Sequence, residues 1–345
     1  MRALVLEDYD KFVFRDIPIP KIANQDDVLI KVKAVSVCGS DVHGMSGATG
    51  RRLPPIIMGH EASGQIVQVG DGVKKFSIGD RVVFNSTLFC GHCDYCQHGM
   101  VNLCDERKVF GVSCEEYKID GAYAEYIVVP ERIVYSIPDR VSYEKAALIE
   151  PFSVGFHAVR VAELGLADTV LVYGSGTIGS FIIQSLKIKG AGKIIATDID
   201  DDKLALAEEM GADYVINSKK TDAESEIKKI APKGLDIVFD VVGKASVARQ
   251  GLEMLKKGGR MVMVGLMDKE IAFPVQRITS WQLRIQGTYI SSDEYPACIE
   301  LISSGRVNLD PFIKHFVPLS EAPSWFNRLR EAEKGLHKVI FNPEK

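Results

Sequence analysis

The sequence predicts an α/β protein that combines a mostly-β part with a doubly wound parallel sheet. The chain has 345 residues, more than one hydrophobic core usually organises, which suggests about two domains. Short apolar runs separated by turn signals fill the first 140 residues or so. From residue 170 onward, strand-like and helix-like runs alternate, which is typical of a parallel sheet covered by helices.

The first part of the chain is predicted to form short strands joined by turns. Val28, Ile30 and Val32 alternate with Lys31 and Lys33, which predicts a strand with one buried and one wet face. Glycine and proline pairs between the runs predict turns. The expected strands are residues 2–6, 12–15, 27–37, 62–69, 81–85 and 122–129.

The second part changes to alternating helices and strands. A helix is expected over 143–160, before the alternation begins. The tail from residue 295 is expected to hold two helical stretches and a last strand, 337–341. The expected strands are 170–173, 193–197, 214–216, 236–242, 260–265 and 283–288, and the expected helices are 182–188, 204–210 and 247–255.

A glycine motif, Gly174-Ser-Gly-Thr-Ile-Gly179, follows the first strand of this alternation and precedes a helix. In that context the motif predicts dinucleotide binding. Gly174 permits a sharp turn, Gly176 lets the backbone approach a pyrophosphate, and Gly179 lets the helix pack closely on the strand. The N-terminus of the following helix would direct N–H groups and a positive dipole end toward the phosphates, and Thr177 and Ile178 of the motif are expected to bind the cofactor as well.

Asp198 ends the second strand of the alternation, where a carboxylate can bind the ribose hydroxyls of NAD. No arginine follows it to receive the phosphate of NADP, and Asp200, Asp201 and Asp202 add negative charge instead. Lys203 could bond the ribose from the other side, although a helix-surface lysine is an alternative interpretation. The sequence therefore predicts NAD as the cofactor.

Charge and hydropathy exclude several partner classes. The formal net charge is −4 and no concentrated run of Lys and Arg occurs, which argues against nucleic acid. The N-terminus carries an acidic residue at once and no apolar core, unlike a signal peptide. No run reaches the ~18 apolar residues that a membrane span requires. We expect a cytoplasmic protein with a small-molecule substrate.

Four of the seven cysteines lie close together, at Cys90, Cys93, Cys96 and Cys104. In a chain without an export signal, this spacing indicates metal binding rather than disulfides. Four thiolates suit a closed, tetrahedral, structural Zn²⁺ site in a lobe of about residues 85–110. His92 and His98 are interpreted as surface residues of that lobe.

A second, dispersed set of ligand-type residues comprises Cys38, His60, Glu61 and Glu150. None is specific alone, because a buried cysteine is usually a small hydrophobe and a glutamate before proline can simply end a helix. Together they supply a thiolate, an imidazole and carboxylates, enough for a catalytic zinc with one open position.

With these motifs the chain resembles, over essentially its whole length, the zinc-containing medium-chain dehydrogenases/reductases, and most closely their sorbitol or polyol dehydrogenase branch. The matching blocks are 38–43, 59–64, 148–151, the four cysteines and the glycine turn. The resemblance implies a GroES-like catalytic domain of residues 1–152 plus 290–345. It implies a Rossmann NAD-binding domain of 153–289 between them, and a homodimer or homotetramer.

The resemblance also implies roles for residues of the dispersed set. Cys38, His60 and Glu61 would bind the catalytic zinc, with Glu150 binding directly or through water. Ser40 would accept the proton of a secondary alcohol, and His43 would pass it to solvent. The hydride would go to NAD.

Two departures from the branch make sorbitol itself a doubtful substrate: Gly44 replaces an aromatic residue, and Ile290 stands near the expected position of a substrate-binding arginine. A third departure concerns the cofactor, because Gly39 stands where several alcohol dehydrogenases carry a basic residue against the pyrophosphate. Arg51 and Arg52 could hold a phosphate or carboxylate of the substrate, but solvated loop charges are the more probable interpretation.

The expected substrate is therefore a polyol, a sugar-alcohol phosphate or a related sugar acid. An alternative is another secondary alcohol, such as butanediol or threonine. A non-catalytic dinucleotide-binding protein is a third possibility, against which the complete set of zinc ligands argues.

Overall fold

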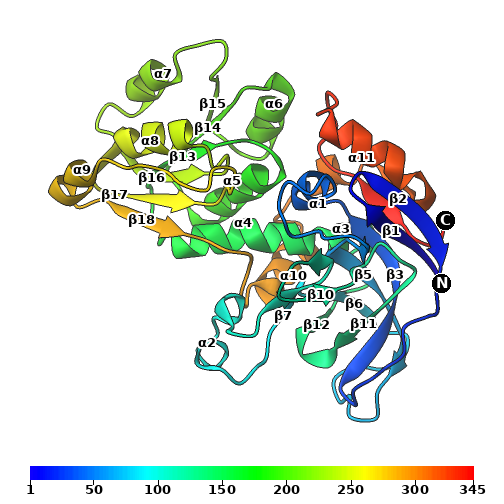
Figure 1. Ribbon diagram of the computed structural model, residues 1–345. Coiled ribbons are helices and arrows are strands. Elements are labelled where there is room, and N and C mark those ends of the chain that lie inside the picture. Colours follow the sequence, from blue (N-terminus) through cyan, green and yellow to red (C-terminus); the bar gives the residue numbers. More distant parts are fainter. The chain divides into compact units, whose positions relative to one another are not determined.

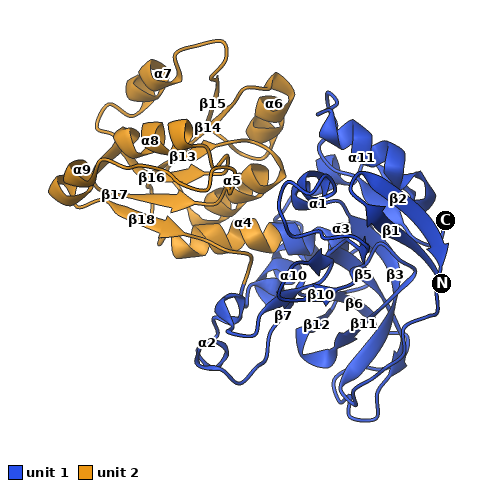
Figure 2. Ribbon diagram, in the orientation of Figure 1, with its two compact units in different colours: residues 1–151, 292–345 blue, residues 152–291 orange.

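The computed structural model describes residues 1–345 and divides them into two compact units (Figure 2). Unit 1 comprises Met1–Pro151 and Ser292–Lys345, and unit 2 comprises Phe152–Ser291. The sequence analysis placed these boundaries at residues 152/153 and 289/290. Each unit has its own sheet and its own core.

Unit 1 is built around a seven-stranded sheet in which β3 (Asp27–Ser36) is a central strand. Over the first half of β3, β5 pairs with one of its edges and β11 with the other. Near the end of β3, β20 pairs with the edge that β11 has left. All three strands run antiparallel to β3. The C-terminal segment thus completes a sheet begun near the N-terminus. The remaining strands of the sheet are β5 (Glu61–Val69), β6 (Arg81–Phe84), β11 (Tyr126–Pro130), β12 (Val134–Ser136), β19 (Phe316–Pro318) and β20 (Ile340–Asn342).

Smaller sheets and short helices complete unit 1 (Figure 1). The three-stranded sheet holds β2 (Lys11–Asp16), β1 (Arg2–Asp8) and β4 (Ile56–Ile57). Two strand pairs are β7 (Thr87–Leu88) with β8 (Lys108–Val109), and β9 (Val112–Ser113) with β10 (Lys118–Ile119). The helices are α1 (Gly39–Gly44), α2 (Asp94–Gln97), α3 (Tyr143–Ala147), α10 (Tyr295–Ser303) and α11 (Ala322–Arg330), and α4 (Ile149–Val161) begins in this unit.

Aromatic side chains from distant segments meet in the core of unit 1. Tyr123 lies edge-on to Phe326 and Phe341, with ring centroids 5.8 and 5.9 Å apart. All three are fully buried. Such edge-to-face pairs favour one defined arrangement of the packed rings beyond the effect of burial. The core thereby fixes the C-terminal helix α11 and strand β20 on the N-terminal strands.

Unit 2 is a six-stranded, wholly parallel sheet in the order β15–β14–β13–β16–β17–β18, with helices on both of its faces (Figure 1). The chain reverses its direction of winding between β13 and β16, the place where open α/β sheets bind ligands. Its strands are β13 (Thr169–Tyr173), β14 (Lys193–Asp198), β15 (Tyr214–Asn217), β16 (Leu235–Asp240), β17 (Leu255–Met263) and β18 (Arg284–Gly287). Its helices are α5 (Thr177–Lys189), α6 (Asp201–Glu209), α7 (Ala223–Ile230), α8 (Ala245–Met254) and α9 (Val275–Trp281).

These architectures confirm the predicted fold class, a mostly-β domain together with a doubly wound parallel sheet. No helix is long and apolar enough to cross a membrane.

Several predicted elements were wrong in detail. The expected helix 143–160 is two helices, α3 and α4, separated at Leu148, and Ser142 caps the first of them. The expected strand 122–129 begins only at Tyr126, because Ala122 and Tyr123 instead donate backbone hydrogen bonds to the segment around Gly59. The structure also contains α1, α7, α9 and β19, which were not expected. Three of these four are seven residues or fewer, too short to show a clear apolar period.

Candidate metal centres and cofactor site

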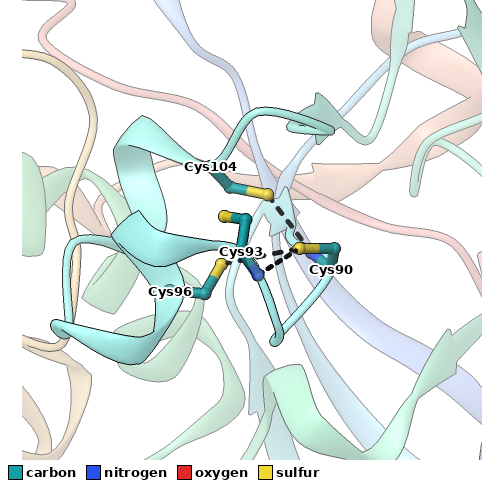
Figure 3. Close-up of side chains that lie close together, drawn as sticks. All are labelled: Cys90, Cys93, Cys96 and Cys104. Carbon is teal, nitrogen blue, oxygen red and sulfur yellow. Dashed lines mark hydrogen bonds between the residues drawn. The ribbon is translucent and has the colours of Figure 1, made fainter.

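The four cysteines of the lobe gather around one point, with their sulfur atoms all within 4.8 Å of one another (Figure 3). Backbone N–H groups of the same loop donate to the sulfur atoms. The N–H of Cys93 lies 3.3 Å from the sulfur of Cys90, and the N–H of Cys90 lies 3.3 Å from that of Cys104. The helix α2 begins after Cys93 and places Cys96 on its first turn. The loop therefore aims its own thiols inward.

The charge environment of this cluster favours thiolates at part of the site. Hydrogen bonds from the backbone of Asp105 and Cys96 lower the pKa of Cys93 to about 6. Burial raises the pKa of Cys96 to about 12. Four sulfur donors at this separation fit a closed, tetrahedral zinc site, which leaves no position for a substrate. His92 and His98 are exposed, with 74% and 64% of their side-chain surface accessible.

The structure also brings together Cys38, His60 and Glu61, whose ligand atoms lie within 4.8 Å of one another. Two neighbouring strands place them. Cys38 follows the end of β3 and precedes α1, whereas Glu61 begins β5 opposite Ser36 of β3. The imidazole of His60 and the carboxylate of Glu61 are buried, and Cys38 is half-buried. Sulfur, nitrogen and oxygen donors in one small space fit the ligand preference of zinc.

A buried carboxylate, Asp41, lies behind the imidazole of His60. Its Oδ2 is 3.7 Å from Nδ1 of His60 and accepts a hydrogen bond of 2.8 Å from the hydroxyl of Tyr123. Burial opposes the charged form of His60, but the negative charges of Asp41 and Cys38 outweigh it and raise its pKa to about 10. The same negative field favours a divalent cation beside His60.

Burial likewise opposes the charge of Asp41. The neighbouring His60 and the guanidinium of Arg52 outweigh it and hold the pKa of this carboxyl below its usual range. Nδ1 of His60 is buried without a hydrogen-bond partner. This imidazole nitrogen can therefore coordinate a metal. Alternatively, it can form a hydrogen bond with Asp41 once a metal is bound.

The two glutamates of the predicted ligand set have different surroundings. Glu61 forms a buried ion pair with Lys338, 2.6 Å from its Oε2, and Ser36 donates to the same oxygen. Glu150 accepts a 2.8 Å hydrogen bond from Ser86, and burial raises its pKa to about 7. Glu150 lies outside the group of three, although its charge acts on His60.

The other predicted catalytic residues, Ser40 and His43, lie on α1 and are exposed. Arg52 does not fit the expectation of a solvated loop charge. Only 4% of its side chain is accessible, and it forms an ion pair of 2.7 Å with Asp41. Arg51 is exposed, and its guanidinium reaches the hydroxyl of Tyr117 at 3.4 Å.

The glycine turn of unit 2 has the geometry that dinucleotide binding requires. Gly174 has a φ of 90°, a conformation that favours glycine. A Cβ on Gly179 would lie 1.9 Å from the carbonyl oxygen of Gly174, so only glycine permits this close packing of helix on turn. A Cβ on Gly176 would meet nothing within 4 Å, which leaves space for a ligand against the backbone.

Asp198 lies beside this turn at the end of β14. Its Oδ2 accepts a 2.8 Å hydrogen bond from the backbone N–H of Ser175, within the glycine motif. Its Oδ1 accepts from the N–H groups of Ile199 and Asp200. The carboxylate is thus fixed in direction, and of its roughly four acceptor positions one, on Oδ2, is left for a ribose hydroxyl. Lys203 is half-buried on α6, the next helix.

Comparisons with known proteins agree with this arrangement. The model of the alcohol dehydrogenase GroES-like domain matches residues 24–139, and that of zinc-binding dehydrogenases matches residues 177–304. The sorbitol dehydrogenase of Bacillus subtilis is 35% identical over 350 residues, which cover 100% of this chain and 98% of the relative. This chain belongs to the zinc-binding alcohol dehydrogenases.

Two further relatives are similar to this chain over nearly its whole length. The D-arabitol-phosphate dehydrogenase of Enterococcus avium is 34% identical, over 97% of this chain and 96% of the relative. A solved structure of an alcohol dehydrogenase from Escherichia coli in complex with NADH has a TM-score of 0.89 and 30% identity, covering 99% of each chain. As a member of this family, the chain is a zinc-containing oxidoreductase that acts on CH–OH groups of small molecules.

Sequence reasoning missed the residues that support buried carboxylates around this dehydrogenase's candidate metal centre. Lys338 pairs with Glu61, whereas Arg52 and the hydroxyl of Tyr123 contact Asp41. No local motif marks these contacts, since each joins residues that are more than ten positions apart in sequence. The one available signal was the charge itself, because a lysine within an apolar strand-like run, such as Lys338, is unusual unless it is paired.

Proposed function

We propose that the chain oxidises a secondary alcohol of a polyol, a sugar-alcohol phosphate or a related sugar acid, with NAD as the hydride acceptor. The observation that carries this proposal is the buried group of Cys38, His60 and Glu61, with their ligand atoms within 4.8 Å. These residues would hold a catalytic zinc, which supplies Lewis acidity toward the alcohol oxygen. Glu150 would complete the site directly or through water. The four lobe cysteines would hold a second, structural zinc.

The proton of the alcohol requires an acceptor near the zinc residues. Ser40 lies two positions after Cys38, on the first turn of α1, and its hydroxyl can receive and release a proton. His43, exposed on the same helix, would carry the proton onward to solvent. Both residues would act through their position on one short helix that begins at a metal ligand.

Cofactor binding is assigned to unit 2. Gly174, Gly176, Thr177, Ile178 and Gly179 would bind the pyrophosphate at the start of α5, where no side chain caps the helix. Asp198 would bind the ribose hydroxyls, with Lys203 beside it. The relative solved in complex with NADH supports this assignment.

The test is NADH formation by the purified chain across a panel of polyols, their phosphates, sugar acids, 2,3-butanediol and threonine. We expect turnover with at least one polyol or polyol phosphate, and activity confined to butanediol or threonine would contradict the proposed substrate class. Absence of activity across the panel, with both zinc ions bound, would favour a non-catalytic dinucleotide-binding protein.

The same assay tests the choice of cofactor. A phosphate on the ribose would meet the carboxylate of Asp198, and a repulsion of about 2–3 kcal/mol gives NAD a preference of roughly thirty- to over a hundredfold. Asp198→Ala should relax this preference mainly by weakening NAD binding. Equal or better use of NADP by the unmodified chain would remove Asp198 from the ribose site.

A homodimer or homotetramer is the assembly we propose, since members of this family usually associate. Size-exclusion chromatography with light scattering tests it, and a monomer at assay concentration would contradict it.

A further inference from the structure

Arg52 occupies space that only a glycine at position 44 leaves open. A Cβ built on Gly44, the last residue of α1, would lie 2.4 Å from Cγ of Arg52, 3.4 Å from its Cβ and 3.3 Å from the hydroxyl oxygen of Thr49, so the severe overlap is with Arg52. Gly44 has no left-handed backbone angle, so its conformation would accept alanine. The neighbouring side chain, rather than backbone strain, explains the glycine.

The guanidinium of Arg52 is nearly saturated by contacts within unit 1. Its Nε and Nη2 donate to Oδ1 of Asp41 at 3.0 and 2.7 Å, and its Nη1 donates to the carbonyl of Arg51 at 3.0 Å. Its Nη2 also donates to the hydroxyl of Ser40 at 3.3 Å. With four contacts made by five N–H groups and only 4% of the side chain accessible, Arg52 is not available to bind a substrate phosphate.

These contacts connect the proposed proton acceptor, Ser40, with the proposed zinc ligand His60. Ser40 is the proposed proton acceptor, and Asp41 faces the imidazole of the proposed zinc ligand His60. Removing Arg52 would leave Asp41 buried with only Tyr123 and His60 beside it, and would leave the Ser40 hydroxyl free to rotate. Because one guanidinium binds both the hydroxyl of Ser40 and the carboxylate of Asp41, it fixes the positions of these two groups relative to each other.

We propose that Arg52, admitted by Gly44, is a positioning residue that holds the Ser40 hydroxyl and, through Asp41, the imidazole of His60. The inference rests on the proposed function for the role of Ser40. Its link to His60 and its packing against Gly44 can be tested without any substrate.

The first test measures packing through thermal stability. Gly44→Ala should lower the melting temperature of the unmodified chain, because the added methyl group meets Arg52. In an Arg52→Ala background, which lacks the obstructing Cγ, the same change should lower the melting temperature by less, because only the milder contacts with the Thr49 hydroxyl and with Cβ of residue 52 remain. An equal loss in both backgrounds would overturn the pairing of Gly44 with Arg52.

The second test measures zinc retention by competition with a chelator. Arg52→Met should weaken zinc binding at the His60 site by about tenfold, toward the lower end of effects seen for groups that orient metal ligands. The zinc of the four-cysteine lobe serves as an internal control and should be unaffected. Arg52→Lys, which keeps the charge, should recover part of the affinity. Unchanged zinc retention in Arg52→Met would overturn the link through Asp41.

The third test combines Arg52→Met with Ser40→Ala in an assay on whichever alcohol the panel identifies. Arg52→Met alone should lower kcat by about ten- to a hundredfold through misplacement of the hydroxyl. The double variant should be slower than Ser40→Ala by less than the factor that Arg52→Met causes alone, because part of the effect of Arg52 passes through Ser40. Multiplication of the two losses would overturn this role.

Arg81→Met is the control for losing an arginine whose side chain is mostly buried. Arg81 binds the carbonyls of Pro138 and Val141 and contacts none of the proposed site residues. It should lower the melting temperature and leave kcat and zinc retention unchanged. If the unmodified chain oxidises no alcohol, the proposed function fails, and the stability and zinc tests still decide the placement of Arg52.

Discussion

The four-cysteine lobe and the group of Cys38, His60 and Glu61 both gather metal-ligand side chains, and they are built in opposite ways. The lobe takes all its donors from one short loop, whose backbone N–H groups bind the sulfur atoms. The other group takes its donors from the adjoining ends of two strands. It requires Lys338 and Arg52 to balance buried charge and the hydroxyl of Tyr123 to donate to a buried carboxylate. A closed site can be encoded locally, whereas an open, reactive site needs support from distant parts of the chain.

The largest expected effect is on turnover, which should fall when the group of Cys38, His60 and Glu61 is altered. Cys38→Ser or His60→Ala should lower turnover by about three orders of magnitude or more, because the loss of a Lewis acid removes several kcal/mol of transition-state stabilisation. Steady-state kinetics on correctly folded protein measures this loss. A variant of either residue that kept near-native turnover would show that the dispersed group is not the reactive one.

Cys93→Ser should instead act on stability. Loss of the lobe's metal should lower the free energy of unfolding on the order of 4 kcal/mol, while folded molecules keep most of their turnover. Urea unfolding and activity per folded chain measure the two quantities. Cys114→Ser, which changes a cysteine outside the lobe, is the control and should alter neither. A large fall in turnover at unchanged stability would make the lobe a catalytic site.

Lys338→Met tests whether the group of Cys38, His60 and Glu61 depends on a residue distant in sequence, because it removes the ion-pair partner of Glu61. Glu61 would remain as a buried charge without its ion-pair partner, which should lower the free energy of unfolding by about 3 kcal/mol. The double variant Glu61→Gln with Lys338→Met should recover part of that loss, since no lone charge remains. Wild-type stability of Lys338→Met in urea unfolding would mean that the pair contributes little.

A smaller effect concerns the anchoring of the lobe. The hydroxyl of Ser292 donates to the carbonyl of Gly99 at 2.6 Å and accepts from the N–H of Val101 at 3.1 Å. Ser292→Ala should lower the free energy of unfolding by about 1–2 kcal/mol, because both backbone groups lose a partner. The exposed Ser304→Ala is its control, expected within about 0.5 kcal/mol of the original. Equal effects of the two serines would show that Ser292 does not anchor the lobe.

Sequence reasoning predicted the features that are local or periodic. The fold class followed from the alternation of strands and helices. The glycine turn was recognisable because its geometry requires glycine, since a Cβ on Gly179 would collide with Gly174. The cysteine lobe was recognisable from spacing alone. In each case the physical constraint acts between residues close together in the chain.

The features that the sequence did not predict depend on contacts between distant segments. Arg52 appeared to be a loop charge, since nothing nearby in sequence shows that Asp41 is buried beneath it. The expected strand 122–129 was too long because the pairing of Tyr123 with Met58 belongs to tertiary structure. The resemblance to a known family supplied the dispersed ligand set, but it did not identify the residues that balance its charge.

Zinc content per chain tests the distinction between the two clusters most directly. Elemental analysis of the purified chain should give two zinc ions, one of them lost in Cys38→Ser and the other lost in Cys93→Ser. Only the first loss should abolish alcohol oxidation. A single zinc ion in the unmodified chain, or loss of the same ion in both variants, would contradict the assignment of a reactive and a structural site.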